Sequence, residues 1–136
     1  MTADFANRSF AFSSATAHDS DGFGEWRVRA EENGRLSIEH HVLGGVTDFG
    51  SFLLSASESA SLWDLITAAA FEGRTPSHRA AVPQEAMLAF ALSAHETLHS
   101  FQLWADEALS DESILRLINA VEMLIEKYTE KKPVLR

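Results

Sequence analysis

The sequence predicts an α+β domain in which an antiparallel sheet of about six strands carries two helices packed on one face. Two patterns lead to this prediction. Apolar and charged residues alternate along 26–30 and again along 36–42, as expected for half-buried strands. Apolar residues recur every three or four positions from Ile114 to Tyr128, as expected for an amphipathic helix. Residues 1–136 are predicted to form a single domain, because a chain of this length folds around one core.

The turn between the two alternating segments sets their register. A three-residue loop at 32–34 places Val28 opposite Ile38, so that two apolar residues share one face. A two-residue loop would instead place Val28 opposite Glu39, an apolar residue against a charged one. We therefore predict the three-residue loop, with Gly34 at the position that needs a left-handed backbone.

The remaining elements follow from local signals. Two further segments have strand character, 8–17 and 46–54. A helix is predicted over 56–70, because Ser55 and Glu58 form a capping box, and Gly73 is its expected terminator. The last helix is predicted over 111–129, with Ser110 as its N-cap.

Composition excludes several classes of function. Cysteine is absent, which removes disulfides, thiolate metal sites and thiol catalysis. The net charge of −9 argues against a nucleic-acid partner, because affinity for phosphates comes from clustered Lys and Arg. No apolar run approaches the roughly 20 residues of a membrane span, so no membrane partner is expected. Residues 1–8 lack the apolar run of a signal peptide, which predicts a cytoplasmic protein.

Residues 84–105 fit two structures. The apolar run 86–92 has the length of a buried strand, yet its Ala, Met and Leu residues also favour a helix. We predict a β-hairpin of 86–92 and 97–104, because a polar segment separates two runs of strand length.

The same region contains an H-E-x-x-H motif formed by His95, Glu96 and His99. On a helix, the two His side chains would share a face and bind zinc, while the Glu would activate a bound water. This is the alternative reading, a small zinc hydrolase. The extended metzincin pattern would need Gly at Gln102 and His at Ala105, and has neither. In the hairpin the two His lie about 13 Å apart along extended chain, so the preferred reading has no metal, cofactor or catalytic residue.

Two predicted loops, 18–24 and 72–84, are the candidate partner-binding surface, since loops on a rigid sheet often carry binding function. Phe23 lies between two glycines in an otherwise polar loop. It is either an aromatic anchor for a partner or a cap folded back over the sheet edge. The candidate contact residues are Asp21, Phe23, Arg74 and His78.

A family resemblance agrees with this reading. The Gly22-Phe23-Gly24 turn after the first strand, a short Leu-rich helix and a closing helix with Leu117 and Ile118 follow one another along most of the chain. This layout resembles emfourin, a small protein inhibitor of thermolysin-type proteases such as protealysin. The chain departs from it at Asp21, where the family has glycine. The resemblance implies a compact, non-enzymatic domain with a protein partner, and protease inhibition as its more specific role.

Overall fold

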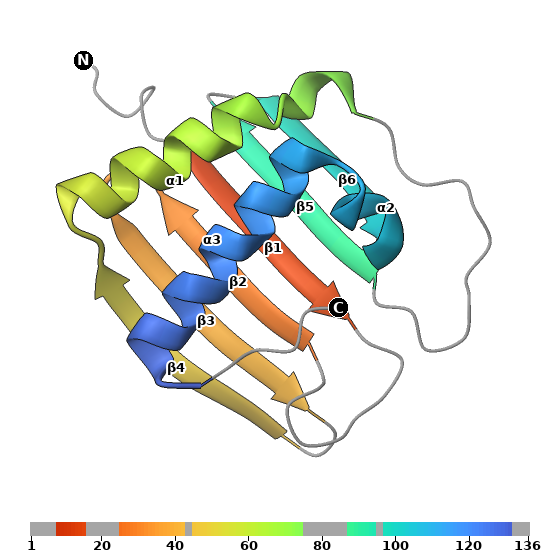
Figure 1. The fold of residues 1–136 in the computed structure, drawn as a ribbon. Coiled ribbons are helices and arrows are strands. Elements are labelled where there is room, and N and C mark those ends of the chain that lie inside the picture. The colour runs from red at the N-terminus through yellow and green to blue at the C-terminus, as the bar shows by residue number, and fades with distance from the viewer. Residues whose placement is uncertain (1–7, 16–24, 43–44, 75–86, 95–96, 132–136) are drawn as a thin grey trace.

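In the computed structural model of the protein, six antiparallel strands form one sheet, and the helices pack on one of its faces (Figure 1). The structure describes residues 8–15, 25–42, 45–74, 87–94 and 97–131. The strand order is β4-β3-β2-β1-β5-β6, so the predicted α+β architecture is confirmed.

The elements have the following bounds. The strands are β1 (Ser9–Ala15), β2 (Glu25–Glu31), β3 (Arg35–Val42), β4 (Gly45–Leu53), β5 (Met87–Ala94) and β6 (Thr97–Trp104). The helices are α1 (Ala56–Ala68), the 3-10 turn η2 (Phe71–Gly73), α2 (Ala105–Leu109) and α3 (Glu112–Thr129).

The β2–β3 hairpin has the predicted register. Val28 lies opposite Ile38, and Trp26 lies opposite His40, whose ring stacks on the indole at 4.0 Å. Gly34 adopts a φ of 99°, in the region that favours glycine, and its amide donates to the carbonyl oxygen of Glu31 at 2.9 Å. The three-residue loop is therefore confirmed.

Helix α1 begins as predicted and ends earlier than predicted. Ser55 and Glu58 form the capping box, with hydrogen bonds of 2.9 and 3.1 Å between their side chains and backbone amides. The helix stops at Ala68, and Ala70 turns into the left-handed region with a φ of 52°. The prediction that Gly73 terminates this helix is wrong. The chain turns sooner because Phe71 enters the core, where it is 4% exposed.

The ambiguity at 84–105 is resolved in favour of strands. β5 and β6 pair in antiparallel fashion, which confirms the predicted pairing of these two strands, and Phe90 lies opposite Phe101. The residues that lie between them in sequence, 95 and 96, are outside the described part of the chain. The short helix α2 was not predicted. It follows β6 directly and buries Ala105 and Ala108.

Helix α3 presents its apolar stripe to the sheet. Its buried residues are Ile114, Leu117, Ile118, Val121, Leu124 and Ile125. The predicted N-cap, Ser110, is wrong by one residue. Oδ1 of Asp111 accepts hydrogen bonds from the amides of Ser113 and Ile114, at 3.1 and 3.3 Å. Ser110 instead ends α2 and donates to the carbonyl oxygen of Asp106 at 2.9 Å.

The core fills the layer between the helices and the sheet. Phe71 lies at the centre of an aromatic cluster there, with ring centroids 5.0 Å from Phe101, 6.0 Å from Phe10 and 6.2 Å from Phe90. One face of the sheet is thus packed against its own helices. None of the helices in the described ranges is long and apolar enough to cross a membrane.

Candidate functional site

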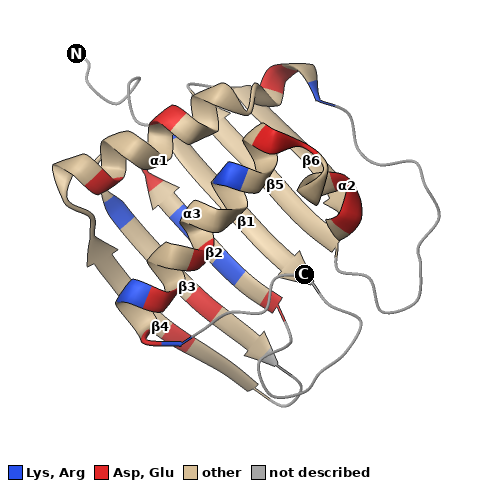
Figure 2. Ribbon diagram, in the orientation of Figure 1, with Lys and Arg blue, Asp and Glu red and all other residues tan. Residues whose placement is uncertain are grey.

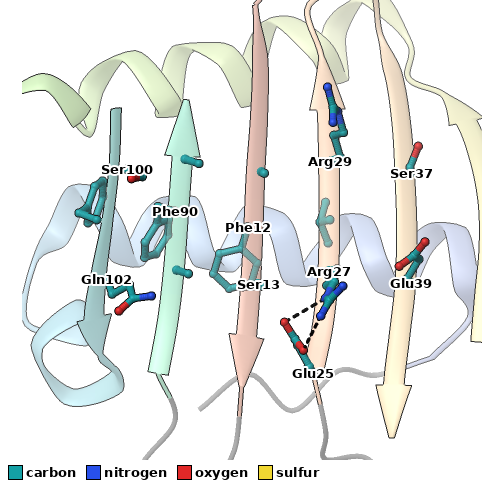
Figure 3. Close-up of a pocket in the computed structure, with 15 residues that line it drawn as sticks. Phe12, Ser13, Glu25, Arg27, Arg29, Ser37, Glu39, Phe90, Ser100 and Gln102 are labelled. Carbon is teal, nitrogen blue, oxygen red and sulfur yellow. Dashed lines mark hydrogen bonds and ion pairs between the residues drawn. The ribbon is translucent and has the colours of Figure 1, made fainter. Parts of the chain in front are cut away.

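The second face of the sheet carries none of the described helices, and Figure 3 views the molecule from this side. Because strand side chains alternate, the residues between the core positions point to this open face. On β1 these include Ala11 and Ser13, beside the buried Phe12. On β2 they include Arg27 and Arg29, which are exposed. This open face is the candidate functional site.

Half of the open face is uncharged. Three adjacent strands, β1, β5 and β6, contain no Asp, Glu, Lys or Arg, although the chain has a net charge of −9 (Figure 2). The charged residues of the sheet lie on β2, β3 and β4. Exposed surfaces are normally rich in charged side chains, and their depletion is typical of interface centres.

A groove of about 700 Å³ crosses this face (Figure 3). Its floor is formed by small side chains in register, because Ala11 pairs with Ala91 and Ser13 pairs with Ala89. Ser100 and Gln102 of β6 border it at one end, and β2 and β3 border it at the other. The small side chains create the hollow, since longer side chains surround them.

The β2–β3 end of the groove is charged, and most of its charges are already paired. Nε and Nη2 of Arg27 donate to the carboxylate of Glu25 at 3.0 and 3.1 Å, and this contact raises the pKa of Arg27. Nε2 of His41 lies 2.8 Å from Oε1 of Glu39. Arg29 makes no hydrogen bond or ion pair with any described residue, and its guanidinium lies apart from the Arg27–Glu25 pair (Figure 3).

These residue types suit binding. Hydroxyls, one amide and the guanidinium of Arg29, which has no partner among the described residues, can hydrogen-bond to a ligand, while the alanine floor offers an apolar contact. The described lining residues include no His, Cys or Lys, and the carboxylates of Glu25 and Glu39 are already engaged by Arg27 and His41. The hydroxyl of Ser37 is 3.3 Å from that of Ser51 on β4, so it bonds to another strand side chain.

Arg74, a predicted contact residue, is engaged inside the protein. Its Nε donates to the carbonyl oxygen of Ala69 at 2.6 Å, Nη1 to Asp111 at 2.7 Å and Nη2 to Ser113 at 3.0 Å. The guanidinium also lies 5.7 Å above the ring of Phe101. Arg74 therefore joins the end of α1 to the start of α3, with its side chain 21% exposed.

The zinc alternative needs a helix through its motif, and the described part of the motif is a strand. His99 lies on β6 opposite Leu92, and its Nε2 is 3.9 Å from a carboxylate oxygen of Glu72. Among the described residues, no three His, Asp or Glu side chains are placed to hold a metal ion. The other predicted site residues lie outside the described ranges: Asp21, Phe23, His78, His95 and Glu96.

The comparisons with known proteins add no family. No protein-family model matches the chain, and no curated protein is significantly similar to it.

The open-face groove was missed at the sequence level. Its signal is present as an alternation of Phe with Ala or Ser along β1, and of Leu or Phe with Ala along β5. The small residues occupy the outward positions, where charged residues are expected. That depletion could have indicated a contact surface.

Proposed function

We propose that the protein is a non-enzymatic binding domain that engages a protein partner through the open face of its sheet. The observation that carries this proposal is the uncharged half of that face, on β1, β5 and β6, beside a groove. An uncharged patch on a protein with a net charge of −9 contributes little to solubility, and contact with a partner accounts for it.

The first partner to test is a thermolysin-type metalloprotease, because the sequence layout resembles an inhibitor of such enzymes. Two surfaces of this protein are then candidates for the contact with the protease. One is the open face, represented by Ala11. The other is the predicted loop 18–24, represented by Phe23.

The test uses three variants of the full chain. Ala11→Tyr fills the groove with a residue that strands accept readily. Thr97→Tyr is the matched control, because Thr97 is also an exposed strand residue and does not line the groove. Phe23→Ala removes the loop aromatic. Each variant is first checked for an unchanged melting temperature.

Inhibition of thermolysin is then titrated with each protein. We expect Ala11→Tyr to weaken inhibition and Thr97→Tyr to preserve it. Loss of inhibition in Phe23→Ala alone would assign the contact to the loop. If the wild type does not inhibit, purified candidate partners identified by affinity capture are titrated in the same way. Partners that all bind Ala11→Tyr as tightly as the wild type would contradict the proposal.

A further inference from the structure

We infer that the groove on the open face receives an amphipathic α-helix of the partner, with an uncharged side toward the sheet and an acidic side chain toward Arg29. This inference rests on the proposed function and specifies the chemistry of the partner. Three features support it: the length of the groove, the pairing of the strands beneath it on both sides, and the charge of Arg29 at one end.

The length of the groove matches a short helix. The lining residues span five neighbouring strands, from β6 to β3. Four spacings of about 4.8 Å give a groove roughly 19 Å long. A helix rises about 1.5 Å per residue, so one of about 12 or 13 residues has this length. A floor of Ala and Ser side chains lets its backbone approach the sheet closely.

The backbone of the floor favours a helix over an extended peptide. β5, β1 and β2 are interior strands, each paired with a neighbour on both sides. They have no free edge to which a further strand could add. An extended peptide lying across them would leave its own N–H and C=O groups unpaired against an alanine floor. A helix satisfies these groups internally and presents only side chains.

The charge without a described partner at the β2–β3 end of the groove favours an acidic side chain on the partner helix. Glu25 and Arg27 bond to each other, and Glu39 lies against His41. Arg29 is left as the one charged lining residue without a partner in the described structure. A carboxylate on the helix would complete a charge-assisted pair there. The other end of the groove, over β5 and β6, is uncharged, so we expect small apolar residues on the part of the partner helix that lies there.

A second copy of this chain fits the groove less well. In a symmetric dimer the same patch would face itself. Two grooves facing each other would leave a void between the floors, where packing contacts are lost. A convex occupant fills the same space.

The test is a selection of displayed 15-residue peptides from a random library on immobilised wild-type protein. Peptides that also bind Ala11→Tyr are discarded. We expect the survivors to carry apolar residues three and four positions apart and an Asp or Glu on one flank.

A synthetic peptide of the consensus should gain helicity on binding. Its affinity should fall at least tenfold in Arg29→Glu and stay unchanged in Thr97→Tyr. A Lys at the acidic position should restore binding to Arg29→Glu.

The other outcomes separate the hypotheses. Survivors with strict apolar alternation would show that the groove binds an extended chain and would overturn the helix, while the open face would stand as the contact surface. If light scattering shows that the wild type is a dimer and that Ala11→Tyr is a monomer, a second copy of the chain occupies the groove, and the inference is overturned. Absence of any peptide that depends on Ala11 would overturn the groove as a docking site. A native partner that still requires the open face would then uphold the proposed function alone.

Discussion

The phenol of Tyr128 donates a hydrogen bond of 2.6 Å to Oε1 of Glu58, which joins the end of α3 to the start of α1. The same oxygen accepts from the amide of Ser55 at 2.9 Å, and the second carboxylate oxygen accepts from Lys127. One side chain thus caps a helix and links two helices that are distant in sequence. The contact lies beside the ring of Phe52 from β4, whose centroid is 5.1 Å from that of Tyr128.

This cluster predicts an acid-sensitive contribution to stability. The hydrogen bonds from Lys127 and then Tyr128 lower the pKa of Glu58 from its ordinary 4.5 to about 2. Because the folded pKa lies below the unfolded one, Glu58 stabilises the fold above about pH 4.5 and loses this contribution as the pH falls toward 2. We expect Glu58→Gln to have a lower free energy of unfolding than the wild type at pH 7, with a gap that narrows between pH 5 and about 2.

Urea denaturation of both proteins at pH 7, 5, 4 and about 2.5 measures this gap. The pKa of Asp111 is also lowered, but Asp111 is present in both proteins, so its contribution cancels in the difference. A gap that is independent of pH would show that the charge of Glu58 does not matter to the fold.

The N-cap of α3 gives a second prediction. Asp111 accepts hydrogen bonds from two amides of the first turn and from Arg74, and the bond from Arg74 is the largest cause of its pKa falling from 3.8 to about 2. Asp111→Ala should lower the free energy of unfolding by about 1–2 kcal/mol, as loss of a cap does. Ser110→Ala, in the adjacent exposed position, should cost within about 0.5 kcal/mol. A loss in Ser110→Ala as large as that in Asp111→Ala would contradict the assignment of Asp111 as the dominant cap.

The elements that could be predicted are those in which burial gives a clear pattern. The register of β2 and β3 followed from the sequence because a slip of one residue would expose Val28 and Ile38. The cap of α3 is predicted one residue too early, because Ser110 and Asp111 are both good cap residues and the five-residue α2 before them has no readable periodicity.

The groove on the open face could not be predicted from local patterns alone, because its prediction also requires the strand order. Ala11 lies beside Ala91 because β1 pairs with β5, a strand far away along the chain. Local patterns show that each strand has a face of small residues. They do not show that these faces adjoin, which requires the strand order.

Zinc binding supplies a third prediction. His99 lies on a strand, where side chains four residues apart are about 13 Å apart along the chain. We expect protein purified without added metal to contain no stoichiometric zinc, and its melting temperature to be unaffected by zinc or EDTA. His99→Ala should respond in the same way. Elemental analysis that finds about one zinc per chain, lost in His99→Ala, would support the hydrolase instead, because a zinc site couples strongly to folding.

The last prediction concerns the turn that sets the β2–β3 register. Gly34 has a φ of 99°, and a Cβ there would lie 3.4 Å from a methyl carbon of Leu53, an ordinary contact. The cost of Gly34→Ala is therefore one of backbone strain, about 1 kcal/mol or more.

The carbonyl oxygen of Gly34 also accepts from the amide of Leu54 at 2.8 Å, so a shifted turn would disturb the end of β4. Gly45→Ala is the matched control, because Gly45 has no positive φ and, among the described residues other than its chain neighbours, no atom lies within 4 Å of its added Cβ. We expect thermal unfolding to show a lower melting temperature for Gly34→Ala and an unchanged or slightly higher one for Gly45→Ala, since alanine restricts the unfolded chain. Equal effects of the two substitutions would mean that the left-handed turn is not what fixes this hairpin.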